Sequence, residues 1–318
     1  MSELAAEFAL IERHFRPLAG PGALDLGDDA ALLVPPPGRE LVVAVDAMVG
    51  GVHFLFDDPP DLVGRKLLRT NLSDLAAMGA VPLGYLMTVS TPRATPDDWF
   101  AGFAAGLAVD QAEFGLSLLG GDTTSTPGPV SLALTILGHV APGAALRRRG
   151  ARAGDGLWVS GTIGDGALGL LAARGEIADP DGTLADRYRL PRPRLALGQA
   201  VAGIAHAGMD VSDGLVQDAG HLCRAGGVGV VIEAAAVPLS PAARAVRRLA
   251  LCLTGGDDYE LLLAAPAEAG PALAEAARST ATPLTRIGQF HAGPPAVTVR
   301  AADGSVMPLG AGGWSHFG

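Results

Sequence analysis

The chain has 318 residues, of which 49% are hydrophobic and 18% are charged, and its formal net charge is −10. A chain of this length and composition is globular and has material for two domains. The negative charge argues against nucleic acid or an anionic membrane as the main partner. Lys66 is the only lysine beside 22 arginines, so no other residue could act as a phosphate-binding or Schiff-base lysine.

Cysteine usage and apolar runs indicate the compartment. Cys223 and Cys252 lie far apart without a CxxC, so we expect buried, reduced thiols and neither a disulfide framework nor a metal site. The opening MSELAAEFALIERHF has apolar residues at helical spacing, which predicts an amphipathic helix and not a secretion signal. No apolar run approaches the ~20 residues that span a bilayer. We therefore expect a cytoplasmic protein that binds no membrane.

Strands and helices alternate along the first part of the chain. The predicted strands are Leu41–Asp46, Leu83–Ser90, Leu116–Leu119 and Val130–Val140, with helices near Asp61–Met78 and Pro96–Glu113. The Gly- and Arg-rich segment Gly143–Gly156 is the best boundary, so we predict domains at 1–142 and 143–318.

The pattern restarts after that boundary. We predict strands at Leu157–Ser160, Val228–Ile232, Tyr259–Ala264, Leu284–Gln289 and Ala296–Arg300, and helices from Gly164, near Pro193–His206 and at Pro266–Arg278. The acidic stretch Asp179–Asp186 is predicted to be a solvated turn, because it lacks the closing glutamate of a calcium loop. The alternation predicts two domains of α/β type.

Aspartates beside glycine or at predicted element ends are the most informative pattern. They occur in GDDAA, VAVDAM, NLSDLAAMGA, LGGDTT, MDVSDG and TGGDDYE. Each alone could shape a turn or cap a helix. However, Asp46 and Asp122 are predicted to end apolar strands, and Asp74 lies inside a predicted helix, where aspartate is unfavourable without a partner. Because strand carboxyl ends in α/β sheets meet at a ligand crevice, we expect these carboxylates to converge.

The stretch LLGGDTTS resembles the end of a phosphate-binding loop in which Asp122 follows the glycines in place of lysine. An aspartate repels phosphate, and divalent cations relieve that repulsion. Mg²⁺ prefers carboxylates together with phosphate oxygens. The sequence therefore predicts several Mg²⁺ ions between the aspartates and a nucleotide, with the arginines at 147–149 adding positive charge.

Eight motifs, in order and across nearly the whole chain, resemble the thiamine-monophosphate kinase family. They are GDDAA, VDAMVGGVHF, NLSDLAAMGA, GGDTT, LRRRGA, MDVSDGL, GGDDYEL and the terminal GWSHF. The wider superfamily shares NLSDLAAMGA and the Asp-containing glycine loops. The resemblance to the kinase family in particular depends on GGVHF, GGDDYEL and the terminal tryptophan. The resemblance implies a two-domain aminoimidazole ribonucleotide synthetase-like fold of class α+β or α/β, each domain a mixed sheet with helices. It also implies a homodimer whose N-terminal domains pair their sheets around the ATP sites.

The resemblance also implies an activity and residue roles. The activity is transfer of the ATP γ-phosphoryl group to thiamine monophosphate, the last step of thiamine diphosphate biosynthesis. Asp74, Asp122 and Asp213 would be the catalytic residues. The implied Mg²⁺ positions are Asp29, Asp46, Asp74, Asp122, Asp210 and Asp213, the ATP positions are Gly121, Asp122, Arg148 and Ser212, and the thiamine monophosphate positions are His53, Asp257 and Trp314.

The sequence departs from the family pattern at two places where residues are expected to contact a metal or the substrate. Ala44 and Val45 precede Asp46 where the family often has hydroxyl residues, so any metal ligand there is a backbone carbonyl. Asp257 stands where a longer glutamate is common.

The implied chemistry needs positioning and charge stabilisation more than proton transfer. A phosphate monoester is largely dianionic at neutral pH and needs no general base, and Mg²⁺ screens its approach to the triphosphate. His53 is predicted to donate a hydrogen bond to the substrate, although a packed histidine also fits the sequence. Trp314 either stacks on the thiazolium or pyrimidine ring or anchors the C-terminus.

Two alternatives stay open. One is another ATP-dependent superfamily member, although selenophosphate synthesis needs a reactive cysteine near the N-terminal glycine-rich loop and no cysteine precedes Cys223. The hydrogenase maturation protein of this fold uses a C-terminal cysteine, whereas this chain ends in WSHFG. The other alternative is a non-catalytic nucleotide- or thiamine-binding protein, which loss of the metal aspartates would favour; they are present.

Overall fold

The computed structural model describes residues 6–309 and 313. These residues form two compact units. One contains the described chain up to Leu75 together with Val81–Pro142, and the other contains Ala76–Ala80 together with the chain from Gly143. Within the described residues, none of the helices has the length and hydropathy to cross a membrane.

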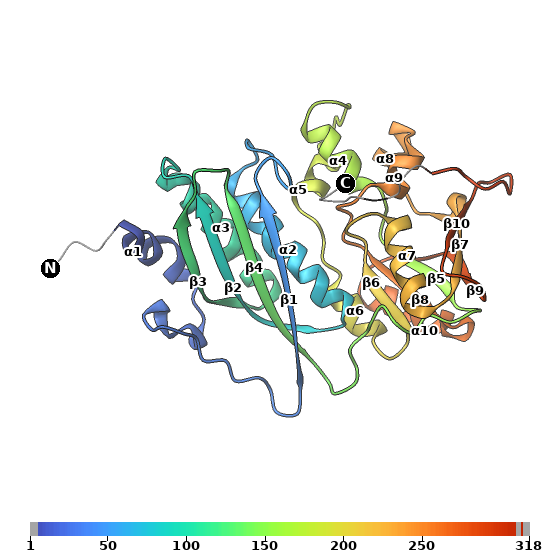
Figure 1. Cartoon of the computed structure of the whole chain (residues 1–318), viewed down its shortest axis with the longest axis horizontal. Helices are drawn as coiled ribbons and strands as arrows, with labels where there is room; N and C mark the ends of the chain where they lie inside the picture. Colours follow the sequence, from blue (N-terminus) through green and yellow to red (C-terminus); the bar gives the residue numbers. More distant parts are fainter. Residues whose placement is uncertain (1–5, 310–312, 314–318) are drawn as a thin grey trace. The chain divides into compact units, whose positions relative to one another are not determined.

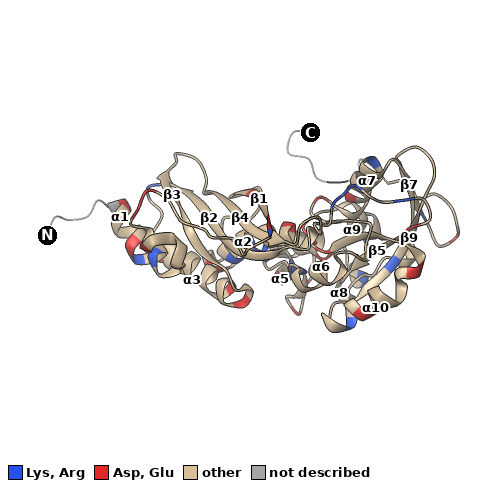
Figure 2. Ribbon diagram, turned by 90° about the horizontal axis from the view of Figure 1, so that it is seen from below, with Lys and Arg blue, Asp and Glu red and all other residues tan. Residues whose placement is uncertain are grey.

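The first unit is built on a four-stranded mixed sheet in the order β1-β4-β2-β3 (Figure 1). Its strands are β1 (Glu40–Val49), β2 (Val81–Thr91), β3 (Ser117–Ser125) and β4 (Ser131–Val140). Strand β4 is antiparallel to both β1 and β2, and β3 is parallel to β2. The two edge strands, β1 and β3, carry the charged residues of this sheet, whereas the central strands β2 and β4 are uncharged (Figure 2).

Helices α2 (Pro60–Ala77) and α3 (Asp97–Phe114) cover one face of this sheet (Figure 1). Their apolar residues recur at helical spacing, so Leu68, Leu72 and Phe103 are completely buried. The predicted N-terminal helix is confirmed in its described part, where α1 (Ala6–Leu10) continues as a π-helical turn (Ile11–Phe15). Two 3₁₀ turns follow, at Arg16–Leu18 and Pro21–Leu26.

The second unit has a six-stranded sheet in the order β10-β7-β9-β5-β8-β6. The strands are β5 (Gly156–Ser160), β6 (Ala207–Asp210), β7 (Gly229–Glu233), β8 (Leu261–Ala265), β9 (Leu284–His291) and β10 (Val297–Arg300). Only β10 and β7 are a parallel pair; the other neighbours are antiparallel.

Helices pack on both faces of this second sheet. The helices are α4 (Asp165–Ala173), α5 (Thr183–Arg189), α6 (Leu195–Val201), α7 (Leu215–Gly226), α8 (Pro241–Val246), α9 (Leu249–Thr254) and α10 (Gly270–Ser279). One core contains Leu222 of α7 with Leu262 of β8, and a second core contains Leu197 of α6 with Leu263 of β8. Consecutive strand residues point to opposite faces, so β8 is buried on both sides.

Three sequence predictions of local structure are wrong. Strand β1 does not end at Asp46, and β3 does not end near Leu119, because each continues as an edge strand, where an aspartate side chain can stay hydrated. The predicted turn at Asp179–Asp186 becomes helical from Thr183, with the Asp179 carboxylate accepting the backbone N–H of Ala185 at 2.9 Å.

Candidate active site

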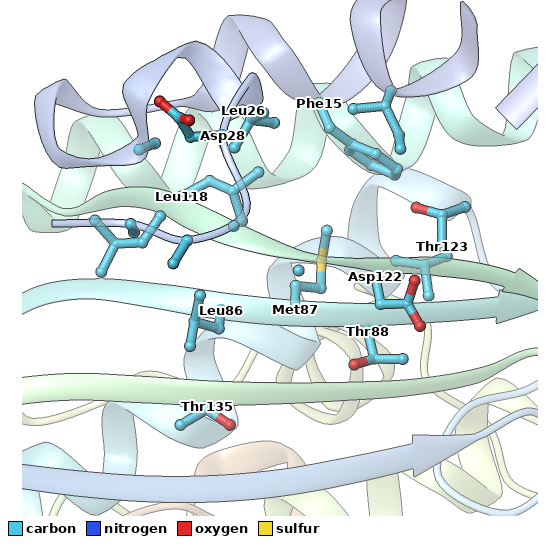
Figure 3. A pocket seen from close by; sticks show the side chains of 18 of the residues that line it. Phe15, Leu26, Asp28, Leu86, Met87, Thr88, Leu118, Asp122, Thr123 and Thr135 are labelled. Carbon is cyan, nitrogen blue, oxygen red and sulfur yellow. The ribbon is translucent and has the colours of Figure 1, made fainter. Parts of the chain in front are cut away.

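A cavity of about 710 Å³ lies against the open face of the first sheet. Strands β2, β3 and β4 line one side of the cavity, and residues between Ile11 and Leu33 line the opposite side. Figure 3 shows Phe15 and Leu26 on that opposite side, and Asp122 beside Thr88, its register partner across β3 and β2. The volume is in the range of small-molecule sites, and the lining combines apolar side chains with a few carboxylates.

Three predicted ligand positions line this cavity, Asp29, Gly121 and Asp122, and Asp28 lines it beside Asp29. Glycine is required at position 121, because a Cβ atom there would lie 1.8 Å from the carbonyl oxygen of Met87. Strands β2 and β3 therefore pack closely where Gly121 precedes Asp122. The acidic GDD segment and the GGD segment, far apart in the sequence, meet at this cavity.

Asp46 and Asp74 belong to a different part of the first unit. The backbone N–H of Asp46 donates to the Asn71 side-chain oxygen at 3.1 Å. Asp74 follows Asn71 by three residues on α2 and so lies on the same side of that helix. Asp46 lies an even number of residues from buried Val42 and Met48, so it shares their face of β1, which is opposite to the cavity. The predicted convergence is thus divided between two places within this unit.

The two residues that depart from the family pattern precede Asp46 on β1. Ala44 lies opposite Ile136 of β4, and Val45 lies opposite Thr135. Val45 is exposed on the open face of the sheet, whereas Ala44 is half-buried. Neither side chain has a polar atom, so only a backbone carbonyl could bind a metal at these positions.

His53 lies in a tight turn after β1. Its backbone N–H donates to the Val49 carbonyl at 2.9 Å, and its Nδ1 accepts the Val49 N–H at 3.0 Å. Nδ1 is therefore an acceptor, and the proton of the neutral imidazole is on Nε2. The ring is half-buried.

In the second unit, the MDVSDG and GGDDYE segments lie side by side. The Asp257 N–H donates to the Ser212 carbonyl at 2.9 Å, and the Tyr259 N–H donates to the Val211 carbonyl at 2.8 Å. Asp257 has a left-handed φ of 68°, and the Tyr259 hydroxyl donates to its carboxylate at 3.2 Å. The structure thus brings together Ser212, a predicted ATP position, and Asp257, a predicted thiamine monophosphate position.

Asp210 ends β6, and Asp213 follows in the turn that leads into α7. The Asp218 carboxylate, buried on α7, accepts the backbone N–H groups of Asp213 and Gly214, each at 3.1 Å. Burial first, and then the carboxylates of Asp210 and Asp213, raise the pKa of Asp218 to about 7. Three carboxylates therefore interact at this turn.

His221 completes a cluster that the sequence analysis missed. Side-chain atoms of Asp213, Asp218 and His221 lie within 4.8 Å of one another. Burial, Arg224 and Arg148 lower the pKa of His221, and Asp213 opposes them. Arg148 is therefore close enough to His221 to influence it. The i, i+3 spacing of Asp218 and His221 places both on one side of α7, but only the fold shows that this side faces Asp213.

The loop that carries Asp257 rests on buried ionisable groups. Asp258 accepts the backbone N–H groups of Gly164 at 2.8 Å and Gly166 at 3.0 Å, at the start of α4. Burial raises the pKa of Asp258 to about 8, against these two hydrogen bonds. Glu260, completely buried, accepts from Arg187 at 3.0 Å and from Arg194 at 2.7 Å. Trp314, the remaining predicted substrate residue, lies outside the described residues.

Both units match known sequence families. AIR synthase related protein, N-terminal domain, matches residues 27–140, and AIR synthase related protein, C-terminal domain, matches residues 152–300. A thiamine-monophosphate kinase of Caulobacter vibrioides is 47% identical over 298 residues, which cover 90% of this chain and 84% of that protein. The chain belongs to the thiamine-monophosphate kinase family. The thiamine-monophosphate kinase of Escherichia coli K12 is 38% identical over 98% of both chains.

Solved structures of thiamine-monophosphate kinases confirm the predicted two-domain fold of mixed sheets with helices. The enzyme of Stenotrophomonas maltophilia K279a matches with a TM-score of 0.84 and 41% identity, over 95% of this chain and 98% of that chain. AaThiL complexed with AMPPCP and TMP matches with a TM-score of 0.78 and 30% identity, over 92% and 91%. The hydrogenase maturation protein HypE in complex with ATP has a TM-score of 0.81 at 20% identity, and this likeness concerns the fold alone.

Proposed function

We propose that this chain transfers the γ-phosphoryl group of ATP to thiamine monophosphate and releases thiamine diphosphate and ADP. The observation that carries the proposal is the match to AaThiL complexed with AMPPCP and TMP over 92% of this chain. Membership of the thiamine-monophosphate kinase family supports it, with 47% identity to the Caulobacter vibrioides protein. No observation favours another superfamily activity or a non-catalytic binding protein.

The first unit would hold nucleotide and metal. Gly121 and Asp122 line the cavity on its sheet together with Asp29, and these residues are assigned to ATP phosphates and Mg²⁺. Asp46, bonded to Asn71 of α2, and Asp74, three residues further along that helix, are assigned to Mg²⁺ as well. Ala44 and Val45, which precede Asp46 on β1, are assigned to Mg²⁺ through their backbone carbonyls.

The carboxylates of the second unit fit a divalent cation chemically. Asp210 and Asp213 each raise the pKa of Asp218, so the three negative charges repel one another, and a cation would relieve this repulsion. Asp210 and Asp213 are assigned as Mg²⁺ ligands. When bound, Mg²⁺ would stabilise the charge that develops during phosphoryl transfer. Asp74, Asp122 and Asp213 are the proposed catalytic residues, each as a ligand of Mg²⁺.

The remaining assignments concern the two substrates. Arg148 and Ser212 would bind ATP phosphates as charged and neutral donors. His53 would donate from Nε2 to thiamine monophosphate, and Asp257, held by Tyr259, would accept from it. Trp314 stays the predicted stacking residue for the thiamine rings. The acceptor phosphate is already anionic, so these residues bind and orient it and need not remove a proton.

We also propose a homodimer that pairs the sheets of the N-terminal domains. The open face of β1 exposes a row of apolar residues, of which Val43 is 59% and Val45 is 63% exposed. Apolar rows of this kind mark interaction surfaces. A Val43→Glu variant should sediment as a monomer at concentrations at which the parent chain is a dimer; a dimeric variant would argue against this face. The cytoplasmic location stays a prediction of the sequence.

The direct test is to incubate the purified chain with Mg-ATP and thiamine monophosphate and to separate the products by chromatography. We expect thiamine diphosphate and ADP in equal amounts. Thiamine and AMP in place of thiamine monophosphate serve as acceptor controls and should give no product. Absence of thiamine diphosphate under these conditions would contradict the proposal.

A further inference from the structure

The only lysine of the chain is buried beneath the turn that carries His53. Lys66 lies on α2 with 3% of its surface exposed, and its Nζ donates to the His53 carbonyl oxygen at 2.9 Å. An ammonium group so far from water is costly unless it makes strong polar contacts. A methionine would fill much the same space without this cost, so the polar contact itself gives the residue a role.

Several further hydrogen bonds hold the turn that contains the His53 carbonyl. The Val49 backbone bonds His53 twice, through the carbonyl to the His53 N–H and through the N–H to Nδ1. Gly51 donates to the Phe54 carbonyl at 2.8 Å, and the Phe54 side chain is buried. Lys66 adds a contact from the helix below, so the His53 backbone is held from the strand on one side and from α2 on the other.

These bonds together determine how the imidazole is presented. Nδ1 is occupied by the Val49 N–H, which leaves Nε2 as the hydrogen-bond donor of the neutral ring. The Nδ1 contact depends on the backbone position of His53, because the ring and the Val49 N–H must stay aligned. A charged donor bonded to the His53 carbonyl restrains that position more strongly than a neutral donor would.

We propose that Lys66 is a positioning residue for thiamine monophosphate: by holding the His53 carbonyl, it fixes the tautomer and direction of the His53 ring that contacts the substrate. The inference rests on the proposed function, in which His53 binds thiamine monophosphate. Lys66 acts through His53 and not on the phosphates, so the missing lysine of the GGDTT loop is not replaced by this one. Loss of Lys66 should therefore weaken binding of thiamine monophosphate and leave binding of ATP unchanged.

A double-mutant cycle with Lys66→Met and His53→Ala tests this coupling by steady-state kinetics. We expect each single variant to raise KM for thiamine monophosphate about 5- to 30-fold, with KM for ATP changed less than about 2-fold. In the double variant, KM for thiamine monophosphate should be no higher than in the single variant with the higher KM. The effects of two substitutions that disrupt the same contact are not additive. Multiplied effects in the double variant, or an unchanged KM in Lys66→Met, would overturn the inference.

Arg65→Met is the matched control. Arg65 precedes Lys66 on α2, but its Nε donates to Asp110 at 2.9 Å, so this variant removes a cation from the same helix without touching the His53 turn. We expect it to lower the melting temperature and to leave KM for thiamine monophosphate unchanged. A rise in this KM that matched that of Lys66→Met would show a general effect of α2 stability, and the inference would fail.

Ring ¹⁵N chemical shifts of His53 give a readout that does not depend on turnover. In the parent chain, His53 should be the Nε2–H tautomer, and Lys66→Met should shift it toward a mixture of both tautomers. An unchanged tautomer would overturn the positioning role even if thiamine diphosphate is formed. If the parent chain forms no thiamine diphosphate, the proposed function fails, whereas a tautomer shift in Lys66→Met would still establish the coupling of Lys66 to His53.

Discussion

The Asn71 side chain accepts the backbone N–H of Asp46 at 3.1 Å and thereby ties the edge strand β1 to helix α2. Asp74 lies one turn further along that helix. The buried Asn71 amide thereby holds Asp46 against the helix that carries Asp74, although the two predicted metal ligands are far apart in the sequence. The arrangement suggests different roles for the two helix residues. Asp74 would contribute its negative charge, whereas Asn71 would hold β1 against α2.

Asp74→Asn should keep the shape of the side chain and remove its charge. Because Asp74 is assigned to several metals, we expect kcat to fall at least ~10²-fold, the cost of losing a major electrostatic contact. The melting temperature should change little. Near-normal turnover in a well-folded Asp74→Asn variant would show that Asp74 is only a helix residue.

Asn71→Ala, unlike Asp74→Asn, should mainly lower the stability of the chain. It removes the Asn71 oxygen that accepts the Asp46 N–H and the Asn71 donor to the Leu67 carbonyl. Leaving buried polar groups unsatisfied costs about 1–3 kcal/mol, so we expect a loss of this size in the free energy of unfolding, measured by urea denaturation. A stability equal to that of the parent chain would mean that Asn71 does not hold β1 to α2.

Activity should depend on free Mg²⁺ beyond the amount that complexes ATP. Aspartates in both units are assigned to metal, and one cation per ATP cannot occupy all of these positions. Initial rates measured against total Mg²⁺ at fixed ATP should continue to rise after ATP is saturated. A rate that reaches its plateau at equal concentrations of Mg²⁺ and ATP would favour a single-metal site.

Asp258→Asn tests the buried carboxyl under the Asp257 loop. Burial raises the pKa of Asp258 to about 8, so between its ordinary pKa and this value the folded chain holds a proton that the unfolded chain has lost. This contribution to stability is greatest at low pH and declines as pH rises, by about 1.4 kcal/mol per pH unit. Relative to the parent chain, Asp258→Asn should therefore gain stability steadily from pH 5 to pH 8.

The measurement is urea denaturation of both proteins at several pH values, because the difference between them removes the other titrating groups. A stability difference that does not vary between pH 5 and pH 8 would show that Asp258 is not protonated in the folded chain.

The sequence predicted most strands and helices of the fold because their apolar periodicity is strong. It placed the ends of β1 and β3 too early, since an aspartate usually ends an apolar run, and only the sheet order shows that both are hydrated edge strands. The four-residue strand β6 was missed because AGMD is too short to show a period and contains a glycine.

The sequence predicted the candidate site residues that lie within motifs. It did not predict those that only the folded chain brings together. The GDD and GGD segments meet at one cavity, but nothing local in the sequence indicates that Asp46 faces away from it. Asp218 and His221 are ordinary helix residues until the MDVSDG turn folds back over them. Lys66 reads as one more polar residue of α2, and its role follows only from the His53 turn above it.

The most direct test of the central claim is an isotope experiment with ATP labelled by ¹⁸O in its γ-phosphoryl group. The parent chain, incubated with this ATP, Mg²⁺ and thiamine monophosphate, should form thiamine diphosphate whose terminal phosphoryl group carries the label, with unlabelled ADP, as measured by mass spectrometry. Asp74→Asn should form the same labelled product far more slowly. Unlabelled thiamine diphosphate, release of AMP, or label found only in inorganic phosphate would contradict transfer of the γ-phosphoryl group to thiamine monophosphate.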